Sequence, residues 1–376
     1  MNILARKMRQ EIERNGPITF ARFMEIALYE PGLGYYEQPH KIGRAGDYFT
    51  SVSTGPLFGR LLAFQFAQWL DSECPNDGIQ LVEAGAHDGQ LAADILAWFE
   101  EKRPDLLRRL EYWIVDPSII RRGWQKKALS SWSSIVKWTE DVGDFAARSV
   151  NGIIFSNEFF DALPVHRLAW DSLDLRWREC RVKSVKDSFV WCLGDLDAAL
   201  IGQVPNVPHD LAKVLPEGFI TEVCPAATKW WTAAAQALEK GKLLAIDYGF
   251  HAENPLRPDR PHGTLRAFSR HHGNDDLLAN PGEQDLTSDV NFFALEQAGK
   301  AAGLDQAKLL RQSAFLVQAY SNIHESSEYL TDLGRKTMAQ FQTLTHPEHL
   351  GHRFQVLTQY RSIQSGPDPL PSSNPG

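Results

Sequence analysis

Short, mostly apolar segments recur along this chain, and helix-like segments separate several of them. They cover residues 79–83, 111–116, 135–138, 152–156 and 243–248. Apolar segments of this length are typical of parallel strands that are covered by helices on both faces. The sequence therefore predicts an α/β fold with a parallel sheet. Sheets of this kind bind ligands outside the carboxyl ends of their strands, where this sequence places polar residues and glycines.

Segments outside the predicted sheet divide the chain further. Residues 3–14 and 18–29 have apolar residues at helical spacing, and alternating segments between 166 and 193 predict an inserted β-rich cap. The predicted parts are an N-terminal helical extension with a substrate loop (1–75), the first part of the core (76–165), the inserted cap and a helix (166–240), the second part of the core with closing helices (241–365) and a disordered tail (366–376).

In the second part of the core, the sequence predicts three helices and one strand. The helices are expected over 287–302, 325–338 and 350–362, and the strand over the apolar segment 314–319. We interpret Asp285 or Thr287 as a cap of the first of these helices.

Charge and cysteine usage limit the partners and the compartment. Lys and Arg total 39 and Asp and Glu total 47, and this net charge of −8 argues against nucleic acid as a partner. No run of apolar residues is long enough for a membrane span, so no membrane partner is expected. The four cysteines form no C-x-x-C pair, and the N-terminus lacks the apolar segment of a signal peptide. We expect a cytoplasmic protein.

A Gly-rich turn, E-A-G-A-H-D-G over residues 83–89, follows the first predicted strand. Backbone N–H groups of such a turn can approach a ligand closely. The pattern G-x-G-x-x-G is absent and Glu83 would repel a pyrophosphate, which argues against the alternative of an NAD-dependent oxidoreductase. Glu83 would instead attract a cationic nucleoside cofactor such as S-adenosylmethionine. The predicted cofactor contacts in this turn are Glu83, Gly85, Ala86, His87 and Gly89.

The ends of the next two strands extend the predicted cofactor site. Asp116, followed by Pro117, ends the second strand, where a carboxylate can accept both hydroxyls of a ribose. Asp141 and Val142 follow the third strand, where an adenine ring would lie. A plain solvated loop is the alternative for both positions.

A third group, S-N-E-F-F-D-A-L-P over residues 156–164, stands at the end of the fourth strand. Asn157, Glu158 and Asp161 could hold and orient a nitrogen nucleophile for in-line methyl transfer. A carboxylate there could also offset the charge of a guanidinium. The alternative is a helix N-terminus that Asn157 caps and the two acids stabilise.

Two loops are predicted to face the substrate. Asp47 and Thr50 lie in the long loop before the third helix, and Arg270 and His271 lie after the fifth strand. A metal site is not expected, because no Cys lies near His271 and the adjacent His272.

These motifs together resemble the MidA family of S-adenosylmethionine-dependent class I methyltransferases. The resemblance covers about residues 3–362, and the strings N-E-F-F-D-A-L-P-V, G-T-L-R and P-G-E-Q-D-L-T-S-D-V are its most specific parts. The other matching stretches are 16–24, 29–36, 46–51, 57–59 and 246–249. Mitochondrial members of the family methylate an arginine of a complex I subunit. The resemblance thus implies a Rossmann-like α/β class I methyltransferase sheet with an N-terminal helical extension and inserted elements over the site. It also implies S-adenosylmethionine as cofactor and a protein arginine as acceptor.

The chain departs from the family pattern in the cofactor turn. The family has E-x-G-x-G-x-G there, and His87 replaces the middle glycine. The alternative function is therefore a catalytically weakened methyltransferase fold that acts as an assembly or binding factor. No transit peptide precedes the first helix of the resemblance, which predicts a bacterial member. Trp170, Trp177 and Trp191 in the cap suggest, as a hypothesis, the surface of a homodimer.

Overall fold

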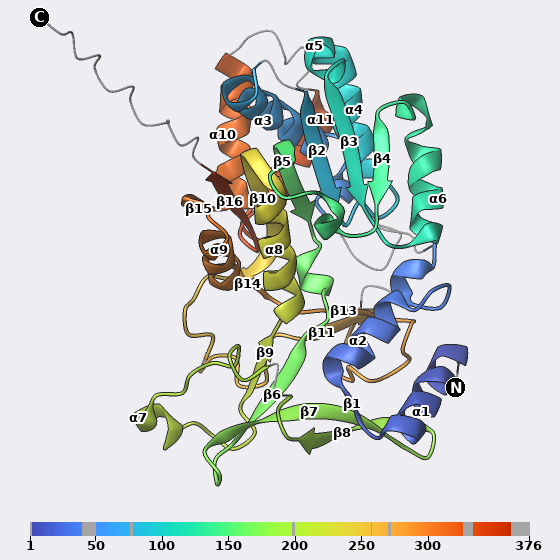
Figure 1. Ribbon diagram of the computed structural model, residues 1–376, viewed down its shortest axis with the longest axis vertical. Coiled ribbons are helices and arrows are strands. Elements are labelled where there is room, and N and C mark those ends of the chain that lie inside the picture. Colours follow the sequence, from blue (N-terminus) through green and yellow to red (C-terminus); the bar gives the residue numbers. More distant parts are fainter. Residues whose placement is uncertain are drawn as a thin grey trace, which may run out of the picture.

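A computed structural model describes residues 2–39, 50–75, 78–197, 200–256, 258–269, 272–325 and 334–361. The predicted tail, 366–376, lies outside these residues. The described residues form a central sheet flanked by helices. Below it in the view lie smaller sheets and two N-terminal helices (Figure 1). No helix in the described ranges combines the length and hydrophobicity that a membrane span needs.

The central sheet confirms the predicted α/β class. Its strand order is β15-β16-β10-β5-β2-β3-β4, and a short β14 also pairs with β10. Five neighbouring strands are parallel: β4 (Val136–Thr139), β3 (Leu110–Val115), β2 (Ile79–Ala84), β5 (Val150–Asn157) and β10 (Leu238–Phe250). At one edge β16 (Phe354–Arg361) lies antiparallel between β10 and β15 (Gln306–Arg311). Each of the five parallel strands coincides with a predicted one.

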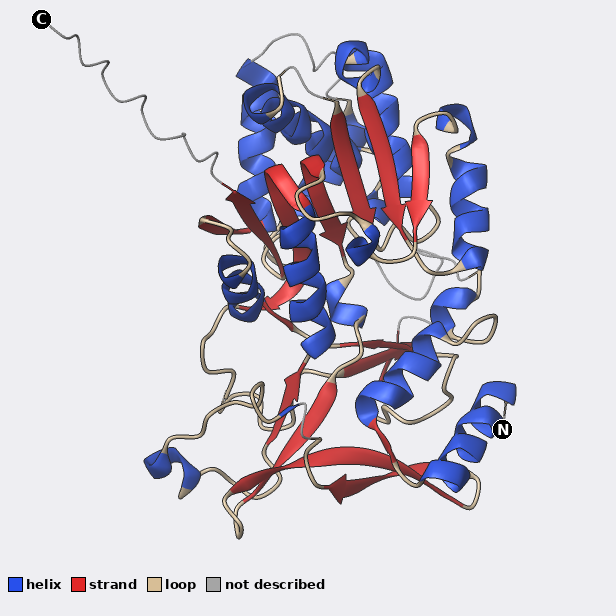
Figure 2. Cartoon of the chain, viewed as in Figure 1, coloured by secondary structure: helices blue, strands red, loops and turns tan. Residues whose placement is uncertain are grey.

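Helices cover both faces of this sheet (Figure 2). One hydrophobic cluster joins the sheet to α3 (Leu57–Glu73), α4 (Gln90–Lys102) and α10 (Gln312–Glu325). A second cluster joins the opposite face to α8 (Pro225–Ala237) and α9 (Phe292–Ala301). Two shorter helices, α5 (Pro104–Leu107) and α6 (Ile119–Ala128), flank β3. Because the sheet is buried on both sides, its apolar strands show no alternation.

Two predictions for the C-terminal third are wrong. Segment 314–319 lies inside helix α10, where Phe315, Leu316, Ala319 and Ile323 face the core at helical spacing. Segment 350–362 contains strand β16, because its alternating buried residues fit between two strands. A short apolar run suits either structure, and only the available neighbours decide. The expected helix 325–338 overlaps α11 (Arg335–Thr345), and residues 326–333 lie outside the described ranges.

The expected helix over 287–302 begins later than predicted. Strands β13 (Asp285–Thr287) and β14 (Val290–Asn291) precede it, and α9 starts at Phe292. The cap is Asn291, whose side chain accepts a hydrogen bond from the Phe293 N–H. Asp285 and Thr287 are therefore not caps of this helix.

The inserted segment forms a sheet with part of the N-terminal extension. Strands β6 (His166–Asp171), β7 (Arg176–Val185), β8 (Ser188–Gly194) and β9 (Ile220–Val223) pair with one another, and β1 (Ile18–Thr19) joins them through β7. Helices α1 (Ile3–Asn15) and α2 (Phe20–Tyr29) pack with this sheet in a third cluster. We call residues 2–39 the arm. Helix α8 packs on the core sheet, although the predicted boundaries grouped it with the cap.

The cap tryptophans do not form an exposed patch. Trp170 and Trp177 are buried against each other, with ring centroids 5.1 Å apart. The Trp191 ring lies 5.1 Å from the Phe20 ring, and the Arg167 guanidinium stands 4.6 Å from its centroid. These contacts lie within the chain, so they remove the observation that suggested a homodimer, and the homodimer itself stays a prediction.

Candidate cofactor and acceptor site

A cleft of about 1870 Å³ opens at the carboxyl ends of β2, β3, β5 and β10. A small sheet of β11 (Arg266–Ser269), β12 (His272–Asn274) and β13 lies beside it. Residues of the arm, of β11 and β13, of α8 and of the segment 348–354 line its other sides. Pockets for single small molecules usually measure about 300–1000 Å³. This cleft therefore has room for a nucleoside cofactor and for part of a second molecule.

Acidic side chains outnumber basic ones in the cleft. Its lining, counted over the described residues, includes twelve Asp and Glu side chains and five Lys and Arg side chains. This excess is nearly as large as the net charge of the whole chain, −8. A cleft with an excess of one sign of charge attracts ligands of the opposite sign. The ligands that suit this cleft are therefore cations.

The Gly-rich turn has a left-handed backbone at three alternate positions. The φ angles of Gly85, His87 and Gly89 are 76°, 45° and 89°. This conformation favours glycine and is tolerated by histidine better than by most residues, which explains how His87 fits the pattern. A Cβ on Gly85 would lie 3.1 Å from two atoms of Phe159, so the turn packs closely on the segment that follows β5. Gly85, Ala86 and His87 line the cleft, whereas Gly89, the N-cap residue before α4, does not line it.

Glu83 is buried at the end of β2 and lines the cleft. The Tyr112 hydroxyl donates a hydrogen bond of 2.6 Å to Glu83 Oε2. Burial raises the pKa of Glu83 to about 7. A bound cation would favour the ionised form, which matches the attraction that the sequence predicts.

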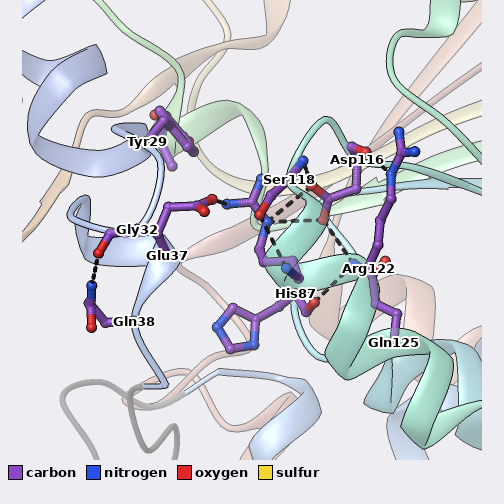
Figure 3. Close-up of polar contacts among 11 residues, drawn as sticks. Tyr29, Gly32, Glu37, Gln38, His87, Asp116, Ser118, Arg122 and Gln125 are labelled. Atoms are coloured by element: carbon purple, nitrogen blue, oxygen red, sulfur yellow. Dashed lines mark hydrogen bonds and ion pairs between the residues drawn. The ribbon is translucent and has the colours of Figure 1, made fainter.

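Protein donors surround the carboxylate of Asp116 (Figure 3). Arg121 donates from Nη2 to Oδ1 at 2.7 Å and from Nε to Oδ2 at 2.9 Å. The Ser118 N–H donates to Oδ1 at 2.9 Å, and the Gln125 amide donates to Oδ2 at 2.8 Å. The other end of the Arg121 guanidinium donates to Glu37 Oε1 at 2.9 Å. The predicted ribose acceptor is thus already paired with an arginine that also binds the arm.

The predicted adenine contacts divide between the cleft and the core. Asp141 and Pro117 line the cleft, and the Asp141 side chain accepts a hydrogen bond of 2.6 Å from the Gly143 N–H. Val142 is fully buried in the hydrophobic cluster under α8. Val142 therefore has a packing role, and its predicted contact with a ligand is corrected.

The three predicted catalytic residues, Asn157, Glu158 and Asp161, all line the cleft beyond β5. No α-helix begins there; a single 3₁₀ turn, Phe160–Ala162, follows. The side chain of Asp247, from β10, accepts hydrogen bonds on Oδ2 from the N–H groups of Phe159, Phe160 and Asp161, at 3.1, 2.9 and 3.3 Å. Asp247 thus takes the role that the helix-capping alternative gave to Asn157.

The electrostatics of this end differ from those at Asp116. No Lys or Arg of the described residues forms an ion pair with Glu158 or Asp161. Glu158 accepts from the Ser51 N–H at 3.2 Å and from the Asn157 amide at 3.1 Å. Burial, with the charge of Asp161, raises the pKa of Glu158 to about 8, and burial raises the pKa of Asp161 to about 6. Buried Oδ1 atoms of Asn157 and Asp161 have no hydrogen-bond partner in the described residues.

A hydrogen-bonded chain connects the cap to this end of the cleft. Glu222 of β9 accepts from the Thr264 N–H at 2.9 Å, and the Thr264 hydroxyl accepts from the Asp289 N–H at 3.1 Å. Asp289 pairs with Arg266, whose guanidinium lies 4.9 Å from the centroid of the Tyr248 ring. This chain explains why G-T-L-R and P-G-E-Q-D-L-T-S-D-V occur together: they contact each other beside the acceptor carboxylates.

The predicted substrate residues are only partly described. Thr50 lines the cleft, whereas Asp47, Arg270 and His271 lie outside the described residues. The residues that the sequence analysis did not assign to the site include four of the lining, Glu37, Arg121, Tyr248 and Asp285, and also Asp247, which lies behind the lining. Asp247, Tyr248 and Asp285 lie in stretches that carried the family resemblance, which was the available signal. Arg121 and Glu37 stand in no such specific string.

The parallel sheet, the Gly-rich turn and the acidic cleft at the strand ends define an S-adenosylmethionine-dependent class I methyltransferase. The model of a family of S-adenosyl-L-methionine-dependent methyltransferases matches residues 61–310. The chain belongs to this family, the MidA-like methyltransferases.

Three known proteins illustrate the similarity. The human protein arginine methyltransferase NDUFAF7, which is mitochondrial, is 28% identical, and the match covers 96% of this chain and 85% of that protein. The Xenopus laevis counterpart is 27% identical, with 95% and 84% covered. A crystal structure from Burkholderia thailandensis, bound to S-adenosyl-homocysteine, is 29% identical with a TM-score of 0.78, covering 95% of this chain and 92% of that one.

The residues present fit S-adenosylmethionine. Gly85 lines the cleft with a backbone that carries no side chain, and the surrounding carboxylates complement a sulfonium and an amino group. The unpartnered Asn157 Oδ1 can accept a hydrogen bond from a bound molecule. The residues that would hold the cofactor are Glu83, Gly85, Ala86, His87, Asp116, Pro117 and Asp141.

Proposed function

We propose that this methyltransferase transfers the methyl group of S-adenosylmethionine to a guanidinium nitrogen of a protein arginine. The observation that carries the proposal is the pair Glu158 and Asp161, two carboxylates at one end of the cleft that form no ion pair with a Lys or Arg of the described residues. Arg266, the cation whose charge lowers the pKa of Asp161, is itself paired with Asp289. A guanidinium is a planar cation that binds carboxylates through paired hydrogen bonds. The names of the NDUFAF7 relatives, protein arginine methyltransferases, support the same acceptor.

When bound, the cofactor supplies an electrophilic methyl group on a positively charged sulfur. The contribution of this chain is alignment and charge placement, since methyl transfer needs little other assistance. Glu158 and Asp161 bind and orient the guanidinium, and the cation in turn lowers the pKa of both carboxyls toward their ordinary values. A C–N bond forms while the S–C bond breaks, and the nitrogen releases one proton. Glu158 is the group placed to accept that proton and pass it to water.

The turn after β5 holds these carboxylates in place. Glu158 has a left-handed φ of 52°, which an L-residue adopts only when its surroundings compensate. The three hydrogen bonds that Asp247 accepts supply this compensation. The turn can therefore remain fixed while an acceptor enters.

Two further parts of the proposal concern the cellular context. We propose a bacterial protein that works in the cytoplasm. All four cysteines lie among the described residues and are free, which suits a reducing compartment. Recovery of the protein in a secreted fraction of the source cells would contradict this location.

Transfer of labelled methyl groups tests the proposed acceptor. Purified protein is incubated with a cell lysate and S-adenosylmethionine labelled on the methyl group, and labelled proteins are hydrolysed to amino acids. We expect the label in methylated arginine with the wild type and not with Glu158→Gln. Label in another amino acid would refute arginine as acceptor. Cofactor binding without any transfer would instead support the alternative of an assembly or binding factor.

A further inference from the structure

Asp116 offers no free acceptor position in the structure. Its two carboxylate oxygens accept hydrogen bonds from the Ser118 N–H, the Gln125 amide and the Arg121 fork, at 2.7–3.1 Å. A carboxylate has about four lone-pair sites, and these bonds occupy all of them. The side chain is 3% exposed. A ribose hydroxyl could therefore bind Asp116 only by replacing one of these donors.

Arg121 is the donor that can leave most readily. Ser118 N–H belongs to the backbone at the start of α6, and Gln125 is held at both ends, since its Nε2 also donates to the His87 carbonyl and its Oε1 accepts from Trp138 Nε1 at 2.9 Å. Arg121 has a long side chain and a second carboxylate partner, Glu37, already bound to Nη1. Moving from Asp116 thus leaves the guanidinium paired with the arm.

We propose that Arg121 sets the cofactor affinity of this methyltransferase by competing with the ribose hydroxyls for Asp116, and that Glu37 receives the displaced guanidinium. The inference rests on the assignment of Asp116 to the ribose. Bound cofactor and the Arg121–Asp116 pair exclude each other, so part of the binding energy is spent on breaking a charge-assisted pair. By linkage, cofactor occupancy strengthens the contact between Arg121 and the arm.

Opposite effects on affinity distinguish competition from a merely structural role. Arg121→Met frees two acceptor positions on Asp116, so S-adenosylmethionine should bind about tenfold tighter. Glu37→Gln leaves the displaced guanidinium without a carboxylate near a cationic cofactor, so binding should weaken several-fold. If the network served only to hold the fold together, both variants would weaken binding or neither would change it.

The neighbouring Arg122 supplies a matched control. It lies in the same helix, and its Nε donates a hydrogen bond of 2.6 Å to the main-chain carbonyl of Asp116, not to the carboxylate (Figure 3). Arg122→Met removes the same charge and should leave the affinity within about twofold of the wild type. A gain in Arg121→Met that Arg122→Met shared would show a general effect of charge and would overturn the inference.

The experiment is isothermal titration of the full chain and the three variants, with S-adenosylmethionine and with S-adenosylhomocysteine. Competition for Asp116 predicts the same gain for both ligands in Arg121→Met, because both carry the ribose. A gain confined to the sulfonium ligand would refute it, and so would unchanged or weaker binding. If Arg121→Met does not fold by circular dichroism, the Glu37→Gln titration decides, and unchanged affinity there overturns the inference. Binding by the wild type keeps the cofactor assignment in either case; absence of binding in all four proteins would remove that assignment together with the inference.

Discussion

The two ends of the cleft hold carboxylates in opposite electrical situations. Asp116, at the end of β3, is paired with Arg121 and has four hydrogen-bond donors within 3.1 Å. Glu158, at the end of β5, accepts two weak hydrogen bonds and has no ion pair with a described cation. Both side chains stand at the same edge of one sheet. The difference lies in their neighbours, and it separates an end that is already neutralised from one that is ready to receive a cation.

The comparison also has an energetic side. A buried carboxyl without a cationic partner prefers the neutral form, so its pKa rises, as it does for Glu158. The acceptor end of the cleft therefore carries a cost in stability that a bound guanidinium would relieve. Functional sites commonly carry such a cost. Four predictions test this difference between the two ends, in order of expected effect.

The largest effect is expected from Asp247→Ala, which removes the acceptor of three backbone N–H groups at the acceptor end. We expect methyl transfer to fall at least a hundredfold and the free energy of unfolding to fall by about 3 kcal/mol, since unsatisfied buried donors cost 1–3 kcal/mol each. Cofactor affinity should change less than threefold. Single-turnover kinetics and titration calorimetry measure both quantities. Asp247→Asn, which keeps an acceptor oxygen, should retain more activity; equal losses would contradict the proposed contact.

Glu158→Gln removes one unpaired carboxylate while keeping its shape. Methyl transfer should fall by about 10²–10³-fold, the usual contribution of a positioned acid or base, with cofactor affinity unchanged. Glu140→Gln is the matched control, because Glu140 is an exposed carboxylate that lines the same cleft. An equal loss in the control would show that only the total charge of the cleft matters.

The pH dependence should report the same carboxyl. Because the ionised form binds the guanidinium and accepts the proton, kcat/KM should rise with pH through about 8 and then level off. The free energy of unfolding should change in the opposite direction. The folded-state pKa lies above the ordinary value, so the free energy of unfolding falls as pH rises from about 4.5 to about 8. In Glu158→Gln both slopes should shrink, and the melting temperature at pH 8 should exceed that of the wild type by a few degrees. Thermal scans at pH 5 and pH 8 check this sign.

The smallest of the four effects concerns the cofactor end. Gly85→Ala places a Cβ 3.1 Å from Phe159 on a backbone with φ of 76°. We expect about tenfold weaker cofactor binding and a loss of about 1–2 kcal/mol in stability. Gly123→Ala is the control, because nothing lies within 4 Å of a Cβ at this helical position. It should raise stability slightly. Unchanged cofactor binding in Gly85→Ala would show that the turn does not touch the cofactor.

Much of the site could be predicted because the ends of buried strands can be recognised in a sequence. The parallel strands of a sheet place their carboxyl ends together, so polar residues after β2, β3 and β5 had to meet. Glu83, Asp116 and Glu158 are found there for that reason. The errors arose where local pattern is ambiguous. Val142 follows a strand like Asp141 does, yet its side chain turns into the core.

The sequence by itself determined the α/β class, the Gly-rich turn and the strand ends at which acids gather, because these follow from periodicity and backbone geometry within a few residues. Only the tertiary structure decided which acid is neutralised. Arg121 is only five residues from Asp116 in the sequence, but its second partner, Glu37, is 84 residues away. Asp247 meets Phe160 across 87 residues. Such contacts depend on how distant segments pack, and the electrostatic difference between the two ends of the cleft depends on them.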